Sequence, residues 1–226
     1  MCGRFTLCSS IKEIAEVLQA ANVKIKEDKA RYNIAPTQEI VAAREDGKRR
    51  ELLTLRWGLV PSWAKDLAAG ARMINARSET VTEKPSFREA FRHRRCLIPA
   101  DGFYEWKRTD RGKQPFFFKM KDEQPFAFAG LWERWEGEGE TIESCAILTT
   151  AANEVLAPVH DRMPVILHEE DYELWLDEDK GKQELLKDLL RPYPASEMTV
   201  YPVSTQVNST RHGGAELIEE LKINSA

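Results

Sequence analysis

The stretch Pro115-Phe116-Phe117-Phe118-Lys119-Met120, followed by Pro125-Phe126-Ala127-Phe128-Ala129-Gly130-Leu131-Trp132, decides the fold class. Both runs are short, rich in aromatic side chains and separated by polar turn residues, which is typical of β-strands. Further β-branched or aromatic runs lie at residues 39–44, 52–57, 96–98, 103–106, 142–150, 164–167 and 198–203. Strands are therefore predicted to dominate the middle of the chain.

The helical patterns are fewer and shorter. Residues 3–7 have a strand pattern, and Ser10-Ile11-Lys12-Glu13 then forms a capping box that opens an amphipathic helix ending near Asn22. The segments 85–94, 169–176 and 183–190 are also predicted to be helical. Strands and helices do not alternate strictly, as a parallel α/β sheet would require. We expect an α+β fold, with a curved, partly closed, barrel-like and mainly antiparallel sheet flanked by helices.

The chain is predicted to form one domain over residues 1–226. It has no internal repeat and no linker rich in Gly, Pro or Ser. Its length of 226 residues is sufficient for a sizeable hydrophobic core. We expect the tail after about residue 215 to be loose, and a monomer is the favoured oligomeric state.

Composition and charge exclude several classes of protein. With 42% hydrophobic and 31% charged residues, the chain is neither disordered nor collagen-like nor a coiled coil. It lacks the roughly 18 apolar residues of a membrane span and the apolar stretch of a secretory signal, so we expect a cytoplasmic protein without membrane contacts. The net charge of −4 would repel nucleic acid, so a DNA or RNA partner must meet a local basic surface.

The four cysteines, Cys2, Cys8, Cys96 and Cys145, form neither a Cys-x-x-Cys pair nor a Cys/His pattern with ligand spacing. A cytoplasmic protein keeps its thiols reduced. We therefore predict no disulfide, no metal site and no cofactor.

Cys2 is the first candidate for chemistry, because removal of Met1 would leave an α-amine and a thiol on adjacent carbons. An α-amine has a reference pKa of ~7.7 against ~10.4 for lysine, so it forms Schiff bases more readily at neutral pH. After the amine condenses with an aldehyde, the neighbouring thiol can close a five-membered thiazolidine ring. Taken alone, however, a cysteine at position 2 is usually an incidental thiol.

Three further polar residues, Asn75, Glu105 and His160, lie in segments that otherwise have sheet or turn patterns. Glu105 stands between Tyr104 and Trp106, where strand alternation favours an outward-facing side chain over a desolvated acid that moves protons. His160 is more often a hydrogen-bonded structural group than a catalyst. Asn75 is equally consistent with a turn or a helix cap.

Two nearby arginines also allow two interpretations. Arg77 and Arg162 are either surface ion-pair partners, which is the usual role, or phosphate ligands, for which the guanidinium fork is well suited. Single residues therefore do not decide the function.

Taken together, these motifs closely resemble the SOS response-associated peptidase family, whose hallmark is an N-terminal Met-Cys-Gly-Arg. In chain order, the resemblance rests on Met1-Cys2-Gly3-Arg4-Phe5, Arg31-Tyr32-Asn33-Ile34-Ala35-Pro36, Trp57-Gly58-Leu59-Val60-Pro61-Ser62-Trp63, Asn75-Ala76-Arg77-Ser78-Glu79, Pro99-Ala100-Asp101-Gly102-Phe103-Tyr104-Glu105-Trp106, His160-Asp161-Arg162-Met163-Pro164 and Pro202-Val203-Ser204-Thr205-Gln206-Val207-Asn208. These seven motifs, in order over nearly the whole chain, make the resemblance specific.

The resemblance implies a sensor of abasic sites that binds single-stranded DNA and joins Cys2 to the sugar aldehyde as a thiazolidine. Members of the family also show a weaker lyase action at such sites. They are called peptidases because the segment ahead of the cysteine is removed, which here is Met1 alone. The resemblance further implies induction by DNA damage, a location on the nucleoid when DNA is bound, and the replication machinery as a candidate partner.

The matching motifs also imply roles for individual residues. Asn75 would hold the Cys2 end and the sugar oxygen. An abasic deoxyribose is mostly a closed hemiacetal, so its opening requires groups that donate and accept protons. His160 would protonate the ring oxygen, and Glu105 would take protons from the amine or from water.

The implied DNA-binding surface consists of arginines on phosphates and of flat side chains on bases, namely Arg4, Arg77 and Arg162 with Trp63, Trp106 and Pro36. This composition suits a binder without sequence preference. After Trp63 the family often has a further aromatic residue, but this chain has Ala64-Lys65-Asp66, so stacking there is expected to be thinner.

Two other functions stay open. An N-terminal-nucleophile amidotransferase also begins Met-Cys-Gly, but that class continues with Ile and uses an Asn-Gly pair, which this sequence lacks. A noncatalytic single-strand-binding module would leave Glu105 and His160 without a purpose. Ammonia release from glutamine would favour the first alternative, and DNA binding without any covalent adduct would favour the second.

Overall fold

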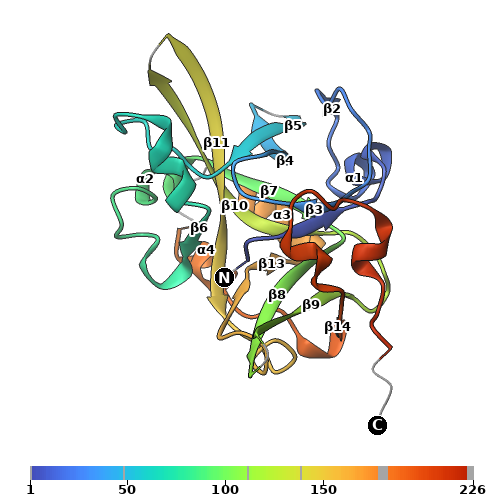
Figure 1. Ribbon diagram of the computed structural model, residues 1–226. Helices are drawn as coiled ribbons and strands as arrows, with labels where there is room; N and C mark the ends of the chain where they lie inside the picture. The colour runs from blue at the N-terminus through green and yellow to red at the C-terminus, as the bar shows by residue number, and fades with distance from the viewer. Residues whose placement is uncertain (1, 48, 111, 138, 178–182, 223–226) are drawn as a thin grey trace.

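Two β-sheets form the centre of the computed structural model, which describes residues 2–47, 49–110, 112–137, 139–177 and 183–222 (Figure 1). In these described residues the smaller sheet has five strands, in the spatial order β14 (Met198–Pro202), β9 (Gly112–Met120), β8 (Gly102–Thr109), β1 (Phe5–Leu7) and β3 (Arg31–Ile34). All of its strand pairs are antiparallel. Phe5 lies opposite Phe103 of β8, so the chain start runs beside the strand that carries Glu105.

The larger sheet has nine strands within the described part of the chain. They follow the order β12 (Arg162–Pro164), β11 (Glu140–Ala151), β10 (Phe126–Gly137), β7 (Arg95–Ala100), β4 (Glu39–Asp46), β5 (Arg49–Trp57) and β2 (Asn22–Val23), with β13 (Ile166–Leu167) on β10 and β6 (Asn75–Arg77) on β11. A further parallel pairing of β11 with β5, through Cys145 and Trp57, joins β5, β4, β7, β10 and β11 into a closed ring. The predicted α+β fold with a curved, mainly antiparallel, barrel-like sheet is confirmed.

The helices are short and lie around the sheets (Figure 1). They are α1 (Ile11–Val17), α2 (Arg88–His93), α3 (Tyr172–Leu176) and α4 (Gln183–Asp188), with the 3₁₀ helices η1 (Leu67–Arg72), η2 (Ser78–Thr80), η3 (Glu169–Asp171), η5 (Ala195–Glu197), η6 (Thr205–Asn208) and η7 (Ala215–Ile218). None of the described helices has the length and apolar character needed to cross a membrane.

Helix α1 begins where the sequence predicts and ends earlier. The Ser10 hydroxyl accepts a hydrogen bond from the Glu13 amide, and the Glu13 carboxylate accepts one from the Ser10 amide, so both halves of the capping box form. The helix ends at Val17 instead of near Asn22, because Gln19 adopts the left-handed conformation with φ 51° and the chain turns into β2.

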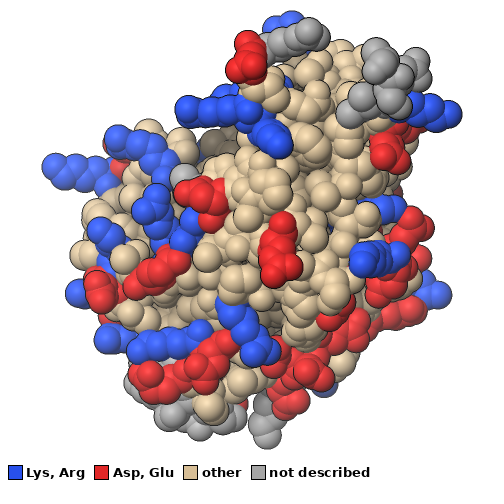
Figure 2. All heavy atoms as spheres, turned by 90° about the horizontal axis from the view of Figure 1, so that it is seen from below, with Lys and Arg blue, Asp and Glu red and all other residues tan. Residues whose placement is uncertain are grey.

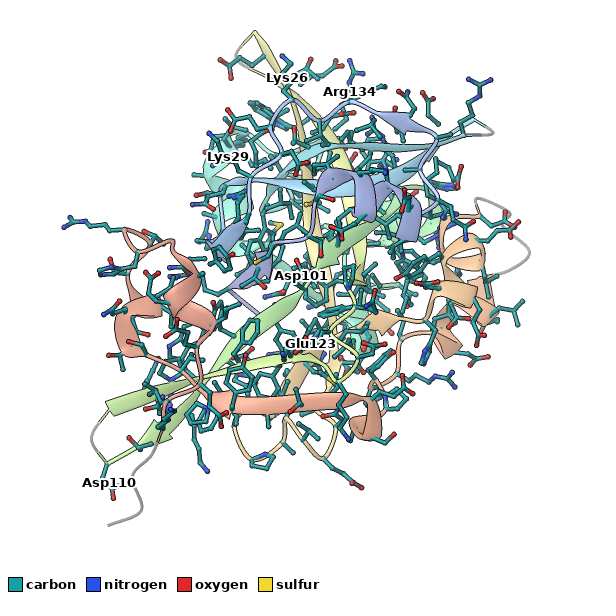
Figure 3. All side chains as sticks on the ribbon, turned by 90° about the vertical axis from the view of Figure 1, so that its right-hand side faces the viewer. Lys26, Lys29, Asp101, Asp110, Glu123 and Arg134 are labelled. Carbon is teal, nitrogen blue, oxygen red and sulfur yellow. The ribbon has the colours of Figure 1, made fainter. Side chains whose placement is uncertain are left out.

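The turn after β1 is fixed by the carboxylate of Asp101, the residue between β7 and β8. Asp101, near the centre of the view in Figure 3, accepts hydrogen bonds from the amides of Cys8 and Ser9 and from the Ser9 hydroxyl. These bonds satisfy backbone donors at the end of β1. They hold the N-terminal strand in place between β3 and β8.

The core has a large and a small part. In the large part Phe5 makes edge-to-face contacts with Trp57 and Phe128, at ring-centroid distances of 5.2 and 5.8 Å. The small part comprises Tyr104, Phe117, Val203, Val207 and Leu217.

The tail after residue 215 was expected to be loose, and the structure differs as far as it describes this tail. Leu217 is fully buried in the small part of the core, and Val203 forms a β-bridge with Glu220. The tail is packed because its apolar side chains cover the outer face of β8 and β9.

Candidate functional site

The candidate site begins with Cys2, which is fully buried. Asn75 Nδ2 donates a hydrogen bond of 2.9 Å to the Cys2 carbonyl oxygen. Asn75 opens β6, which pairs in parallel with β11 through Ile147, so a barrel strand sets the position at which Asn75 meets the chain start. The Asn75 Oδ1 atom is buried and accepts no hydrogen bond from any described residue. It is therefore an acceptor that a ligand hydroxyl can satisfy.

The Cys2 thiol is held in its neutral form. Burial raises its pKa far above the usual range, and the negative charge of Glu105 raises it further. The thiolate is the nucleophilic form of cysteine, so the buried sulfur needs a neighbouring base before it can attack. Because the charge of Glu105 acts on the thiol, that carboxylate is close enough to be considered for this role.

A cavity of about 490 Å³ opens beside the chain start and is lined by Gly3, Arg4, Glu105, Trp106, Arg108, Lys113, His160 and Asn208. Its volume lies within the range of small-ligand sites. Four residues that sequence reasoning proposed for the site, Arg4, Glu105, Trp106 and His160, therefore share one cavity. Gly3 and Arg4 directly follow Cys2, so the cavity adjoins the candidate nucleophile.

Glu105 points inward with an exposed fraction of 2%, so the outward orientation favoured by strand alternation is wrong. Phe103 stacks on Phe118 in the large core, whereas Tyr104 belongs to the small core on the opposite face of β8. Glu105 shares the face of Phe103, because side chains two residues apart lie on the same side of a strand. Alternation misleads here since the C-terminal tail covers the face that would otherwise meet solvent.

His160 precedes β12 and is partly exposed, with 28% of its side-chain surface accessible. Its Nδ1 atom accepts a hydrogen bond of 3.0 Å from the Arg162 amide, from which we assign the proton of the neutral ring to Nε2. The exposed Asp161 carboxylate lies 3.0 Å from the same Nδ1 and would pair with the ring only in its charged form. The Nε2 atom therefore carries an N–H group, which can donate a hydrogen bond in the neutral ring and can give up its proton when the ring is charged.

Arg4 is fixed by the C-terminal segment. Its Nη1 donates hydrogen bonds to Asn33 Oδ1 and to the Val207 carbonyl, at 2.6 and 2.7 Å. Asn33 Nδ2 in turn donates to the carbonyls of Ser209 and His212, at 3.0 and 2.8 Å. These bonds use Nη1 and leave Nε and Nη2 of Arg4 for a ligand.

The two other predicted arginines differ in their surroundings. Arg162 forms an ion pair with Glu79, and it also donates to the Thr149 carbonyl. The Arg77 side chain is exposed and has no hydrogen-bond or ion-pair partner among the residues that the structure describes, although its backbone belongs to β6. The ion-pair interpretation therefore describes Arg162 in this structure, and Arg77 is free to meet a phosphate.

The predicted base-packing residues do not all lie at the cavity. The Trp106 indole lines it and donates a hydrogen bond of 2.7 Å to Asn208 Oδ1. Trp63 is 64% exposed and lies outside the cavity, on a segment whose Ala64 carbonyl accepts a hydrogen bond from Trp135. Pro36 is half-buried in the turn after β3, and it too lies outside the cavity.

Sequence reasoning named no role for Asn33, Glu79, Thr149 or Asn208. Asn33, Glu79 and Asn208 stand inside the quoted motifs, so the motifs carried a signal for them. Thr149 lies in a buried strand outside these motifs, so the sequence held no signal for its contact with Arg162.

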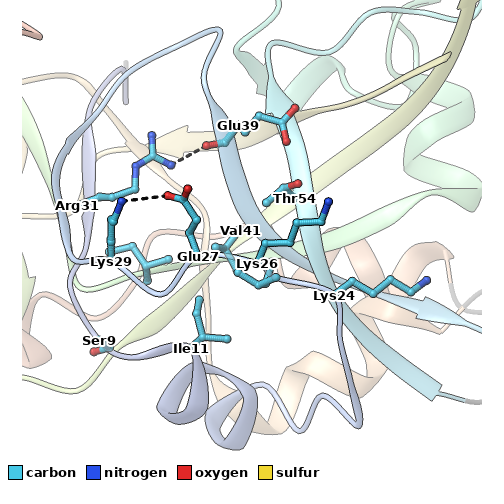
Figure 4. A pocket seen from close by; sticks show the side chains of 12 residues that line it. Ser9, Ile11, Lys24, Lys26, Glu27, Lys29, Arg31, Glu39, Val41 and Thr54 are labelled. Atoms are coloured by element: carbon cyan, nitrogen blue, oxygen red, sulfur yellow. Dashed lines mark hydrogen bonds and ion pairs between the residues drawn. The ribbon is translucent and has the colours of Figure 1, made fainter. Parts of the chain in front are cut away.

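A second, larger cavity of about 570 Å³ lies between α1, β3, β4 and β5 (Figure 4). None of the predicted site residues lines it. Three of its four basic side chains already have partners on this protein: Arg31 donates to the Glu39 carbonyl at 2.6 Å, Lys29 pairs with Glu27 at 3.5 Å, and Lys24 pairs with Glu51. We therefore place the candidate site at the cavity beside Glu105.

Charges on the molecular surface are mixed. On the face shown in Figure 2, basic and acidic side chains are interspersed. DNA binding would therefore rest on individual arginines rather than on one uniformly basic face. Among the described residues, no group of three or more His, Cys, Asp or Glu side chains could hold a metal ion.

With this geometry in view, comparison with known proteins identifies the family. The family model described as "SOS response associated peptidase (SRAP)" matches residues 1–210. This chain belongs to the SRAP family. The family membership inferred from the seven motifs is confirmed.

This SRAP-family chain is similar to the abasic site processing protein YoqW of Bacillus subtilis, with 47% identity over 222 residues, which are 97% of this chain and 99% of that protein. It is also similar to the abasic site processing protein YedK of Escherichia coli, with 31% identity over 224 residues, covering 97% and 99% of the two chains. A solved structure of a protein from Bacteroides thetaiotaomicron superimposes with a TM-score of 0.86 at 26% identity, covering 97% of this chain and 100% of that one.

Proposed function

We propose that this SRAP-family member senses abasic sites in single-stranded DNA and joins Cys2 covalently to the lesion. One observation carries the proposal: a single cavity is lined by Glu105, by His160 and by Gly3, the residue next to Cys2. Asn75 holds the Cys2 carbonyl at the same place. A carboxylate, an imidazole and the start of the chain therefore converge where an aldehyde could react.

The reaction begins once Met1 has been removed and the α-amine of Cys2 is free. In its charged imidazolium form, His160 gives the proton on Nε2 to the ring oxygen of the closed sugar and becomes neutral, and a base takes the proton of the hydroxyl group, so the aldehyde opens. The amine attacks the aldehyde carbon, and loss of one water gives an imine. The thiol then adds to the imine carbon and closes the thiazolidine ring. The whole sequence releases one water.

Glu105 would move the proton of the thiol. The Cys2 thiol is neutral because its pKa is raised, so the sulfur must lose its proton as it attacks the imine carbon. Glu105 accepts this proton and passes it to the nitrogen, which becomes the amine of the ring. Glu105 and His160 carry the same protons in the opposite direction when the adduct reverses.

DNA would be held by the three arginines and by exposed flat side chains. Arg4, Arg77 and Arg162 contact phosphates, each adding about 0.7 to the salt dependence of binding to a single strand. Trp63, Trp106 and Pro36 pack on bases, and each stacked base is worth roughly 1–3 kcal/mol. These contacts offset the repulsion caused by the net charge of −4.

The proposal includes a weaker lyase action at the lesion and release of Met1 either by the chain itself or by an aminopeptidase. It places the protein in the cytoplasm, on the nucleoid when DNA is bound. It needs no cofactor and a monomer suffices. The replication machinery, which exposes single strands, is the proposed partner.

The test is adduct formation with a single-stranded oligonucleotide that carries one abasic site. Protein verified by mass to begin at Cys2 is incubated with it, and the products are examined by denaturing electrophoresis and intact mass spectrometry. We expect a heat-stable species with the summed mass minus one water, and none from Cys2→Ala. Cys8→Ala is the matched control, because Cys8 is a half-buried thiol at the far end of β1 and should be dispensable.

Absence of an adduct from protein that begins at Cys2 would contradict the covalent mechanism. Binding without an adduct would then favour the noncatalytic module. Cys2-dependent release of ammonia from glutamine would favour the amidotransferase instead.

A further inference from the structure

The guanidinium group of Arg162 has few donors left for a phosphate. Nη1 and Nη2 both donate to the Glu79 carboxylate, at 2.5 and 2.9 Å, and Nη2 also donates to the Thr149 carbonyl. Nε is buried and bonds to no described residue. Of the five N–H groups of an arginine, two therefore have no partner among the described residues: the buried one on Nε and one on Nη1. The paired donors that would bind a phosphate in bidentate fashion are occupied by a carboxylate.

The two members of this ion pair differ in how freely they can separate. The Arg162 side chain is 14% exposed and stays anchored by Thr149, while its amide is bonded to His160. The Glu79 side chain is 51% exposed and comes from the short helix η2. A carboxylate that turns into solvent keeps its hydration, whereas a buried guanidinium that loses its partner does not. Glu79 is therefore the member that leaves.

We propose that Glu79 is an internal competitor for DNA phosphate at Arg162. In the free protein its carboxylate fills the guanidinium fork, and in the complex a phosphate of the single strand takes its place. This inference rests on the proposed function. The exchange keeps Arg162 neutralised in both states and leaves the hydrogen bond from its amide to His160 in place. Glu79 thus sets the affinity for DNA without taking part in the chemistry.

Glu83 is a matched control for the removal of one negative charge. Glu79 and Glu83 line the same shallow cavity of about 440 Å³, and Glu83 is exposed. Glu83 has no ion-pair partner among the described residues, and so it holds no arginine. Glu79→Gln and Glu83→Gln remove the same charge from neighbouring positions, but only the first frees Arg162.

The experiment measures the affinity for a single strand with a tetrahydrofuran abasic analogue, which has no aldehyde and cannot form an adduct. Fluorescence anisotropy is recorded over a range of salt concentrations for the wild type, Glu79→Gln, Glu83→Gln, Arg162→Ala and the double variant Arg162→Ala/Glu79→Gln. We expect Glu79→Gln to tighten binding roughly two- to fivefold, the range of a partly exposed ion pair. Its salt slope should stay close to that of the wild type, because Arg162 meets the same phosphate in both complexes, whereas Arg162→Ala should lower the slope by about 0.7.

Two comparisons make the result specific. Glu83→Gln should leave the affinity for the analogue unchanged. In the Arg162→Ala background Glu79→Gln should have no effect on this affinity, because Glu79 then has no guanidinium group to occupy. With an oligonucleotide that has a true abasic site, Glu79→Gln should lower the concentration needed for half-maximal adduct formation and keep the rate at saturation.

Weaker binding by Glu79→Gln would overturn the inference and make Glu79 a support for Arg162. Equal gains from Glu79→Gln and Glu83→Gln would also overturn it, because general charge would then explain the result. Both outcomes leave the proposed function intact. If the wild type itself does not bind the analogue, the proposed function fails together with this inference.

Discussion

At the scale of single residues, the orientation of Glu105 has the largest consequence. It lies with Phe103 on the inner face of β8, and its charge acts on the Cys2 thiol. A carboxylate placed there can carry the proton that sulfur loses during ring closure. If it does, its removal should slow chemistry without weakening DNA binding.

We expect Glu105→Gln to slow adduct formation about 10²- to 10⁴-fold, the usual contribution of a general acid or base. The affinity for the tetrahydrofuran analogue should stay nearly unchanged. Single-turnover adduct formation and anisotropy measure the two quantities separately. Glu133→Gln is the control, because Glu133 is also a buried carboxylate but lies on β10 and pairs with Arg94 at the end of α2. Equal losses of rate and affinity would instead give Glu105 a binding role.

The motifs predicted the residue types at the site, but not how these residues contact one another. Cys2, Glu105 and His160 were recognisable from their segments, whereas simple alternation placed Glu105 outward. The ion pair of Arg162 with Glu79 joins residues 83 positions apart, and the bond of Arg4 to Val207 joins residues 203 apart. Such contacts depend on tertiary packing, which no local pattern encodes.

At the scale of elements, strands with several apolar residues were predictable and the short polar ones were not. The runs at 115–120 and 142–150 became β9 and β11. By contrast, β6 has only three residues, Asn75–Arg77, and becomes a strand because it pairs with β11. A strand of this kind owes its conformation to its neighbour rather than to its own propensity.

The close packing of β8 on β9 yields a prediction for Gly102. Gly102 lies opposite Thr6, and a Cβ atom at this glycine would be 2.2 Å from Phe117 Cζ and 2.7 Å from the Phe118 carbonyl oxygen. We expect Gly102→Ala to reduce the free energy of unfolding by roughly 1–3 kcal/mol, as overpacking usually does. Urea unfolding measures this change. Gly213→Ala should be nearly neutral, because nothing lies within 4 Å of its added Cβ.

A midpoint of urea unfolding for Gly102→Ala equal to that of Gly213→Ala would contradict the close packing of β8 against β9 at this glycine. A large loss in Gly102→Ala with an intact rate of adduct formation would show that the strand pair supports the fold without positioning Cys2.

At the scale of the whole molecule, the barrel is closed by a pairing of two strands over only two residues each, which the sequence does not predict. β11 and β5 pair in parallel only through Ser144 with Arg56 and Cys145 with Trp57. The sequence predicted curvature because the strands are antiparallel and short. The closure itself depends on where β5 ends relative to β11. This relative position is set by the packing of both strands in the folded protein and not by a local sequence pattern.

The buried thiols predict how stability changes with pH. Burial raises the pKa of Cys2, Cys96 and Cys145 above the usual value of 9.0. In the unfolded chain these thiols ionise near pH 9, whereas in the folded protein they keep their protons. The stabilisation is therefore fully present below about pH 8.5 and decreases as the pH rises beyond it, by about 1.4 kcal/mol per pH unit for each thiol.

Urea unfolding between pH 7.5 and 10 tests this expectation. The variant Cys96→Ala/Cys145→Ala removes two of the three thiols and should show a shallower decrease above pH 8.5. Its lower stability at every pH, caused by lost packing, does not affect the slope. A slope equal to that of the wild type would mean that other groups cause the alkaline decrease.

The bonds between Arg4, Asn33 and the segment from Val207 to His212 have a consequence for synthesis on the ribosome. Arg4 leaves the exit tunnel long before the Val207 carbonyl that fixes it, because the two residues are 203 positions apart. In a nascent chain that pauses before residue 207, Cys2 is therefore exposed while Arg4 still lacks its hydrogen bond to the Val207 carbonyl. Translation must therefore pass residue 212 before all of these bonds can form, so products shortened before that point should hold Arg4 less firmly.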